Sequence, residues 1–160
     1  MSDELTTFDI KILEQIQRDA SLSTGELADK IGLSQSPCWR RLQRLKDEGY
    51  ISRQVALLDR TKFKQSFVIF ASLKMATLTE EKREDFLRMI AITPEIMECH
   101  SVLGEMDLLL KVLASSLQWY QTFIFRVLLK LPGVQDVQST VTLTELKYET
   151  AIPVRGNLAL

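Results

Sequence analysis

The sequence predicts an α+β chain of two domains, a helical domain followed by one built on an antiparallel sheet. The first 50 residues show only the helical spacing of apolar residues, and tight turns separate the helices. After residue 65 the pattern changes, because β-rich apolar runs alternate with two amphipathic helices. The length of 160 residues, 46% of them apolar, is enough for two small hydrophobic cores.

The first two helices are expected to begin at capping boxes, in which two side chains three positions apart bond to each other's backbone N–H groups. Thr6 with Asp9 is one candidate box, and Ser23 with Glu26 is the other. Gly32 should end the second helix, because glycine tolerates the left-handed backbone found at helix ends. These residues predict two short helices with a tight turn after the second.

A third helix is expected to begin at Ser34 and to end at Gly49, with Pro37 in its first turn. Ala28 permits the second and third helices to approach closely, and Cys38 should face the core. Three short helices with a glycine turn between the last two are typical of a helix-turn-helix. We therefore predict that fold for the first domain.

The third helix divides into a buried stripe and an outward arc. At 100° per residue, Leu42 and Leu45 lie within about 40° of Cys38. The opposite arc, roughly 100° wide, holds Ser36, Arg40, Gln43 and Arg44. Arginine can donate two parallel hydrogen bonds to guanine, and glutamine can pair with adenine, so this arc is a candidate for reading bases in the major groove.

Neighbouring side chains suit contacts with phosphates, which position a protein on DNA without reading its sequence. The candidates are Gln35, Arg41, Lys46 and Arg53, with Ser36 also able to meet a phosphate at the positive end of the helix dipole. A solvated helix face is the alternative, and a basic cluster alone would favour it. The place of this cluster on the third helix of a helix-turn-helix favours double-stranded DNA as the partner.

The net charge of −1 hides a local imbalance. Residues 1–33 hold three basic and seven acidic side chains, whereas residues 34–62 hold seven basic and three acidic ones. The longest apolar runs fall far short of the roughly 20 residues that a membrane-spanning helix needs, and the first residues do not resemble a secretory signal. We therefore expect a cytoplasmic protein with no membrane partner.

The second domain should follow the order strand, helix, strand, strand, helix, strand. The strands are expected in residues 66–75, 95–103, 108–114 and 134–143, and the helices in residues 79–92 and 115–133. The side chains expected to face inward from the first helix are Phe86, Leu87, Met89 and Ile90, and those expected to share one face of the last strand are Val137, Ser139, Val141 and Leu143. This βαββαβ order is that of the ferredoxin-like fold.

These elements divide the chain into three parts. Residues 1–52 form the helix-turn-helix DNA-binding domain, which we expect to be winged-helix-like. Residues 53–65 form a connector strand or hinge, and residues 66–160 form the ferredoxin-like domain. The change in periodicity after residue 65 sets the second boundary.

In these features the sequence resembles the leucine-responsive regulatory protein family, also called the Lrp/AsnC family or feast/famine regulators. The matching segments are DIKILEQIQRDA, LSTGELADKIGLSQSPCWRRLQRLKDEGYI, VALLD, GEMDLLLKV and LPGVQDVQST followed by KYETAIP. The resemblance implies a DNA-binding transcription regulator whose second domain dimerises and senses a small molecule, usually an amino acid. It also implies homodimers that assemble further, commonly into octamers, with the connector QVALLD pairing with its counterpart in the partner subunit.

The resemblance places the effector pocket between dimers, near the turn that joins the second and third strands of the sheet and near the last strand. The residues that it implies are Gly104, Glu105, Met106, Asp107, Ser139 and Thr140. Backbone N–H groups at the turn could bind a carboxylate, Asp107 could pair with an α-ammonium group, and Ser139 or Thr140 could add a hydroxyl. Alternatively, Gly104 only supplies a positive φ and Asp107 only caps the turn. Leu108 stands where family members often have tyrosine, so the effector's identity does not follow.

Two other classes of protein compete with this interpretation. The chain has a single histidine, His100, and no phosphate-binding loop, dinucleotide fingerprint or Ser/His/Asp set, so we expect no catalytic residue and no enzyme. Cys38 and Cys99 lack metal-ligand spacing, so we expect no metal and no cofactor besides the effector. Sirohaem decarboxylases resemble this architecture and could use His100, but the basic third helix argues against them. The sequence leaves open an architectural DNA-binding protein without an effector.

Overall fold

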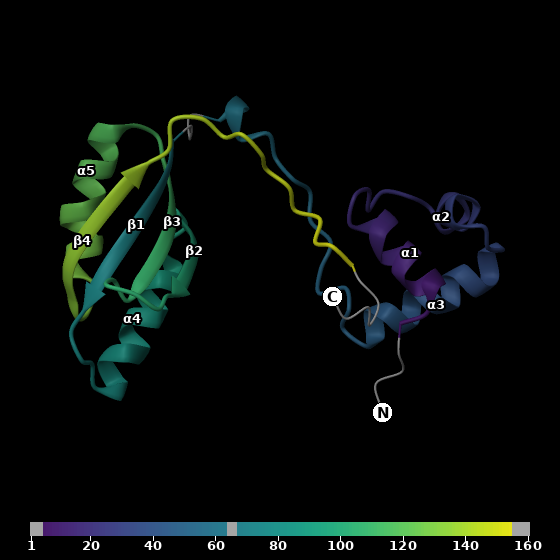
Figure 1. Cartoon of the computed structure of the whole chain (residues 1–160), viewed down its shortest axis with the longest axis horizontal. Helices are drawn as coiled ribbons and strands as arrows, with labels where there is room; N and C mark the ends of the chain where they lie inside the picture. Colours follow the sequence, from purple (N-terminus) through teal and green to yellow (C-terminus); the bar gives the residue numbers. More distant parts are fainter. Residues whose placement is uncertain (1–4, 64–66, 155–160) are drawn as a thin grey trace. The chain divides into compact units, whose positions relative to one another are not determined.

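The computed structural model describes residues 5–63 and 67–154 of the chain. The described residues form two compact units, each with its own hydrophobic core. The helical unit contains the residues up to Leu57 together with those from Lys147 onward, and the sheet unit is Leu58–Leu146. Figure 1 gives the element labels.

The helical unit is built on α1 (Thr7–Ile16), α2 (Thr24–Ile31) and α3 (Gln35–Asp47). Both capping boxes are confirmed, one at the start of α1 and one at the start of α2. Gly32 and Gly49 follow α2 and α3 with φ of 74° and 79°, as expected of glycines that end helices. The local signals in the sequence therefore set these helix ends correctly.

The buried stripe of α3 is confirmed. Cys38 and Leu45 are wholly buried, and Leu42 is nearly so, in one cluster with side chains of α1 and α2. Burying a leucine or isoleucine side chain contributes about 1.5–3 kcal/mol, so this stripe holds α3 against the other two helices. Because the stripe fixes the rotation of α3 about its axis, it also fixes which side chains face outward.

The sheet unit has the expected βαββαβ order. Its elements are β1 (Phe67–Met75), α4 (Glu80–Ile92), β2 (Ile96–Ser101), β3 (Leu108–Ala114), α5 (Leu117–Arg126) and β4 (Val134–Val141), with short 3-10 turns η1 (Arg60–Lys62) and η2 (Leu128–Lys130). The strands are antiparallel in the order β2-β3-β1-β4, as Figure 1 shows. The fold is therefore α+β and ferredoxin-like.

The core of the sheet unit lies on one face of the sheet. Ile69, Ala71 and Leu73 alternate along β1 and are fully buried in a cluster with Phe86 of α4 and Phe123 of α5. Both long helices therefore pack on the same face, and the other face of the sheet carries no helix among the described residues.

Three expectations about this unit were wrong in detail. Leu87 is 53% exposed, because the inward stripe of α4 follows the i, i+3, i+4 spacing from Phe86 and leaves Leu87 beside it. Leu143 does not belong to the last strand, because β4 ends at Val141, and its side chain is 99% exposed. The second helix ends at Arg126, where Val127 leaves the helical conformation with φ −121° and ψ −66°, and η2 follows; Leu131, before Pro132, is extended.

The connector contains no assigned strand within residues 53–63, and the remainder of the predicted connector lies outside the described residues. It runs without regular structure to Asp59 and then enters η1, where an Arg60 nitrogen lies 2.5 Å from Glu145. Pairing of the connector with a partner subunit stays a prediction.

The segment that follows the sheet unit contacts the helical unit. The side chain of Gln17, the C-cap residue of α1, donates to the Ile152 carbonyl at 2.8 Å and accepts from the Ile152 N–H at 3.0 Å. Val154 packs against the helical core. We call residues 147–154 the return segment. Our boundary for the second domain, residues 66–160, stays a prediction, but the return segment groups with the helices.

Candidate DNA-binding face and effector loop

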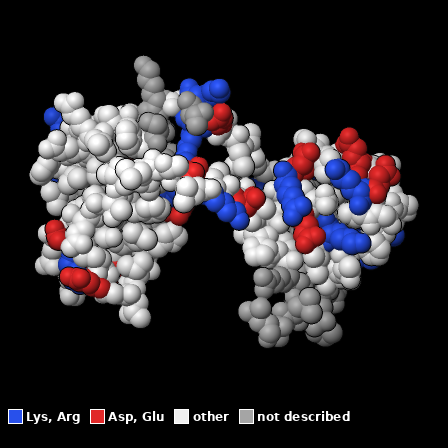
Figure 2. Space-filling model, turned by 45° about the horizontal axis from the view of Figure 1, so that its top comes forward, with Lys and Arg blue, Asp and Glu red and all other residues white. Residues whose placement is uncertain are grey.

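The outward side of α3 carries a hollow lined by arginines. Arg40, Arg41 and Arg44, with Pro37, line a space of about 280 Å³. Their spacing of three or four residues places them along one side of the helix. Arg40 is exposed, whereas Arg41 and Arg44 are half-buried. Figure 2 shows basic side chains mixed with acidic ones on the helical unit.

The other predicted DNA-binding residues lie at the surface of the same unit. Those that are exposed are Gln35, Ser36 and Arg53, and those that are half-buried are Gln43 and Lys46. The side chain of Ser34 makes no capping bond at the start of α3, although it is the N-cap residue. The first turn of α3 therefore presents backbone N–H groups, which suit an anionic partner.

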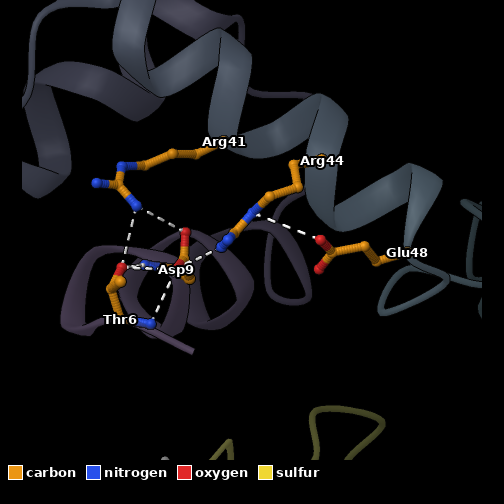
Figure 3. A network of polar contacts seen from close by, with 5 residues as sticks. All are labelled: Thr6, Asp9, Arg41, Arg44 and Glu48. Atoms are coloured by element: carbon orange, nitrogen blue, oxygen red, sulfur yellow. Dashed lines mark hydrogen bonds and ion pairs between the residues drawn. The ribbon is translucent and has the colours of Figure 1, made fainter. Parts of the chain in front are cut away.

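Asp9 of α1 reaches the arginines of α3, which the sequence did not reveal. Its carboxylate is wholly inaccessible to solvent and accepts from Arg44 Nη2 at 2.7 Å and from Arg41 Nη1 at 3.2 Å. Thr6 donates to the same carboxylate through its backbone N–H at 2.8 Å and its hydroxyl at 2.6 Å. Figure 3 shows this network, with Glu48 on the other side of Arg44 at 4.0 Å from Nε.

The surroundings of Asp9 keep it ionised. Burial opposes the charged form, but the hydrogen bonds from Thr6 and Arg41 and the charge of Arg44 outweigh it and lower the pKa of Asp9. Asp9 is therefore a fixed negative charge under the basic helix. The sequence suggested only the capping role of Asp9, because its arginine partners lie 32 and 35 residues away.

The loop that precedes β3 is tied to the end of β1 by Asp107. Its carboxylate accepts the Met75 N–H at 2.8 Å and lies 3.4 Å from the Lys74 ammonium, which also donates to the Glu105 carbonyl at 2.7 Å. The hydrogen bond from Met75, helped by Lys74, lowers the pKa of Asp107. Asp107 is thus an ionised and partly exposed carboxylate.

Gly104 does not adopt a positive φ. The alternative, in which a glycine stands here only to supply a positive φ, is therefore wrong. A Cβ at this position would also meet nothing within 4 Å. Neither conformation nor packing in the described chain therefore requires a glycine here. Glu105 is exposed and Met106 is half-buried in the same loop.

Ser139 and Thr140 lie on β4, on the far side of β1 from the loop. Ser139 pairs with Ala71 and Thr140 with Phe70, so their side chains point to opposite faces of the sheet. The Ser139 hydroxyl lies 2.7 Å from the hydroxyl of Tyr120, whose pKa is raised by burial although the bond to Ser139 opposes this. Among the described residues, no contact joins this pair to the Gly104–Asp107 loop.

His100, the one histidine, lies on β2 in a surface ion cluster. Its Nε2 is 3.2 Å from Glu98, which also accepts from Lys111 at 2.8 Å. In residues 5–63 and 67–154 no group of His, Cys, Asp or Glu side chains could hold a metal ion. None of the helices described is both long and apolar enough to cross a bilayer.

The helix-turn-helix with its arginine-lined third helix, joined to a ferredoxin-like unit, defines a two-domain DNA-binding regulator. Comparison with protein families agrees: residues 5–52 match the winged helix-turn-helix DNA-binding domain, and residues 68–152 match the Lrp/AsnC ligand binding domain. The chain belongs to the Lrp/AsnC family of transcriptional regulators.

Several known proteins are similar over nearly the whole chain. The glutamate uptake regulatory protein of Zymomonas mobilis is 33% identical over 96% of this chain and 93% of its own. The proline dehydrogenase transcriptional activator of Rhizobium radiobacter is 36% identical over 94% and 96%. A transcriptional regulator of Neisseria meningitidis, solved as a complex with L-methionine, superposes with a TM-score of 0.89 at 34% identity, covering 93% of this chain and 96% of that one.

Proposed function

We propose that this regulator binds double-stranded DNA through the outward side of α3 and that its assembly or DNA affinity responds to an amino acid. We further propose that it acts in the cytoplasm and catalyses no reaction. The observation that carries the proposal is the hollow lined by Arg40, Arg41 and Arg44 on the third helix of a helix-turn-helix. Guanidinium groups on such a helix can meet both base edges and phosphates.

Within this face, Arg40 is the leading candidate for reading bases. It is exposed, and no described residue forms an ion pair with it, whereas Arg41 and Arg44 are held by Asp9. Gln43 and Ser36 complete the reading face in our proposal. Arg44 adds a base contact from the edge of this face. The contacts to phosphates come from Gln35, Arg41, Lys46 and Arg53.

Replacement of Arg40 by alanine tests the reading face. We expect Arg40→Ala to weaken binding to a duplex that the chain selects from a random pool by about 1–3 kcal/mol, with relaxed preference at one position of the site. Fluorescence anisotropy on the selected duplex and on a scrambled one of equal length measures both effects. Lys46→Ala is the matched control, because loss of a phosphate contact should weaken both duplexes alike. Equal losses for Arg40→Ala on both duplexes would contradict base reading.

An amino acid suits the loop at Gly104–Asp107. Asp107 is an ionised, partly exposed carboxylate that can pair with an α-ammonium group, and open space surrounds Gly104. The relatives named for glutamate uptake and proline dehydrogenase, and the structural neighbour that holds L-methionine, support an amino acid as the effector class. Glu105 and Met106 belong to the same loop. Because Ser139 and Thr140 lie beyond β1, we propose that a second subunit supplies them.

A thermal-shift screen of the twenty amino acids tests the effector. A ligand that binds the folded chain raises its melting temperature, so we expect at least one amino acid to stabilise it. Asp107→Ala should abolish that shift while DNA binding persists, and Asp136→Ala is the control for removal of an acidic side chain from the same unit. A flat screen would favour an architectural DNA-binding protein, and an unchanged shift in Asp107→Ala would move the site elsewhere.

Assembly into dimers, and further into octamers, forms part of the proposal. Three side chains of the connector, Val55, Leu57 and Leu58, are apolar and yet exposed. The described chain does not cover these side chains. Pairing with the connector of a second copy would bury them, and a symmetric dimer would present two α3 helices to half-sites about one helical turn apart or a multiple of it.

A further inference from the structure

Asp9 does more than cap α1. The start of α2 has the same kind of capping box, in which Glu26 accepts from the Ser23 N–H at 2.8 Å and from its hydroxyl at 2.7 Å. Glu26 is exposed and contacts no arginine of α3 among the described residues. A capping box therefore requires neither burial nor arginine partners, and the burial and the two arginines at Asp9 call for another explanation.

The carboxylate of Asp9 fixes where two guanidinium groups lie. Both arginines belong to α3. Arg41 donates from Nη1 to Asp9 Oδ1, and Arg44 donates from Nη2 to Asp9 Oδ2 (Figure 3). Arg41 also donates to the Thr6 hydroxyl at 3.1 Å. A long arginine side chain otherwise samples many rotamers, so these bonds remove conformational freedom before any ligand arrives.

The same bonds limit the charge that α3 presents. A DNA phosphate near Arg41 or Arg44 must compete with an ionised carboxylate that lies 3.2 Å or 2.7 Å from the guanidinium. The Asp9 carboxylate is inaccessible, so solvent screens this attraction weakly. Exposed Arg40 has no such competitor among the described residues.

We propose that Asp9 is a positioning residue that sets the sequence selectivity of α3, because it holds Arg41 and Arg44 in fixed places and restrains them from binding phosphates indiscriminately. The proposal rests on the DNA-binding role of α3 proposed above. Selectivity is the ratio of the affinities for a cognate and an unrelated duplex, and non-specific binding comes almost entirely from phosphate contacts. Loss of the Asp9 charge removes one competitor for both guanidinium groups, so it should raise non-specific binding and lower this ratio.

Substitution Asp9→Asn in the full chain tests this. We expect affinity for a scrambled duplex to rise several-fold, and the ratio of selected to scrambled affinity to fall about tenfold or more. The slope of log affinity against log salt on the scrambled duplex should steepen by about one for each additional phosphate that the variant neutralises. The matched control is Glu48→Gln, which removes one negative charge beside Arg44 but leaves Asp9 in place. Equal effects of both variants on ratio and slope would overturn the proposal.

A second variant keeps the test decisive where Asp9→Asn does not fold. Asp9→Glu retains the charge but moves the carboxylate by one methylene, so the arginines should lose their positions. We expect its selectivity ratio to fall with little change in salt slope, and an unchanged ratio in a folded Asp9→Glu protein would overturn the proposal. If α3 did not read bases at all, Arg40→Ala would leave the ratio of selected to scrambled affinity unchanged. This result distinguishes failure of the proposed function from failure of the role proposed for Asp9.

Discussion

Asp9 and Asp107 both join elements that are distant in the sequence, but only one of them can also meet a ligand. Each accepts a backbone N–H and faces a basic side chain, and each has a lowered pKa. Asp9 is wholly buried, whereas the side chain of Asp107 is 40% exposed. Burial therefore commits Asp9 to the interior of the helical unit and leaves Asp107 available at the surface.

The helical unit should lose stability in acid through Asp9. The folded pKa of Asp9 lies below the unfolded value of about 3.9, so its contribution is complete above roughly pH 4 and is lost as the pH falls through the folded pKa. We expect Asp9→Asn to reduce the unfolding free energy near neutral pH by about 2–3 kcal/mol. This is below the value for a fully buried ion pair, because the arginine side chains are 34% and 32% exposed.

Urea unfolding of the full chain at a series of pH values, followed by circular dichroism, measures this effect. The difference in stability between the wild-type and Asp9→Asn chains should shrink as the pH falls from about 5 to about 2. Asp29→Asn is a control, because Asp29 of α2 is exposed and its carboxylate bonds to no other described residue. A difference that stays constant over this range would show that Asp9 does not act through its charge.

At the scale of elements, two glycines of the sheet unit differ in whether the fold requires a glycine at their position. Gly133, before β4, has a φ of 78°, and its carbonyl accepts the Ala76 N–H at 2.7 Å. A Cβ on Gly133 would collide with Leu78. Gly104 has an ordinary φ and open space around it. The fold therefore requires glycine at the first position and not at the second.

Alanine substitutions should separate these roles. We expect Gly133→Ala to reduce stability by about 2–4 kcal/mol, through the left-handed backbone and the collision with Leu78. Gly104→Ala should change stability by no more than about 0.5 kcal/mol, yet weaken the stabilisation given by an amino acid that binds at this loop. Thermal melts with and without the amino acid found by the screen measure both. A large loss of stability in Gly104→Ala would contradict the assigned lack of a structural role.

The sequence predicted the elements better than the contacts between them. Capping boxes, terminal glycines and the stripe through Cys38 depend on residues no more than seven positions apart, and all of these were confirmed. The bonds from Asp9 to Arg44 and from Gln17 to Ile152 span 35 and 135 residues, and no local pattern encodes them. The buried stripe of α3 was therefore predictable, but the bonds that hold Arg41 and Arg44 at Asp9 were not.

At the scale of the whole molecule, the polypeptide passes between its two compact units twice, after Leu57 and after Leu146. The second passage follows β4 and continues into the return segment. This segment helps to line a cavity of about 600 Å³ within the helical unit, together with α1 and the connector. Two segments of the chain thus belong to the helical unit. The second one, the return segment, is held by hydrogen bonds to Gln17 and by apolar packing.

Gln17 should hold the return segment on α1. Its side chain makes both hydrogen bonds to the Ile152 backbone, and each such bond contributes about 0.5–1.5 kcal/mol. We expect Gln17→Ala to speed hydrogen exchange in residues 147–154 by roughly five- to thirtyfold, as measured by mass spectrometry on the full chain. Gln15→Ala removes the same type of side chain two residues earlier, in the last turn of α1, and should leave that exchange unchanged. Equal protection in both variants would mean that apolar packing, through residues such as Val154, holds the segment without Gln17.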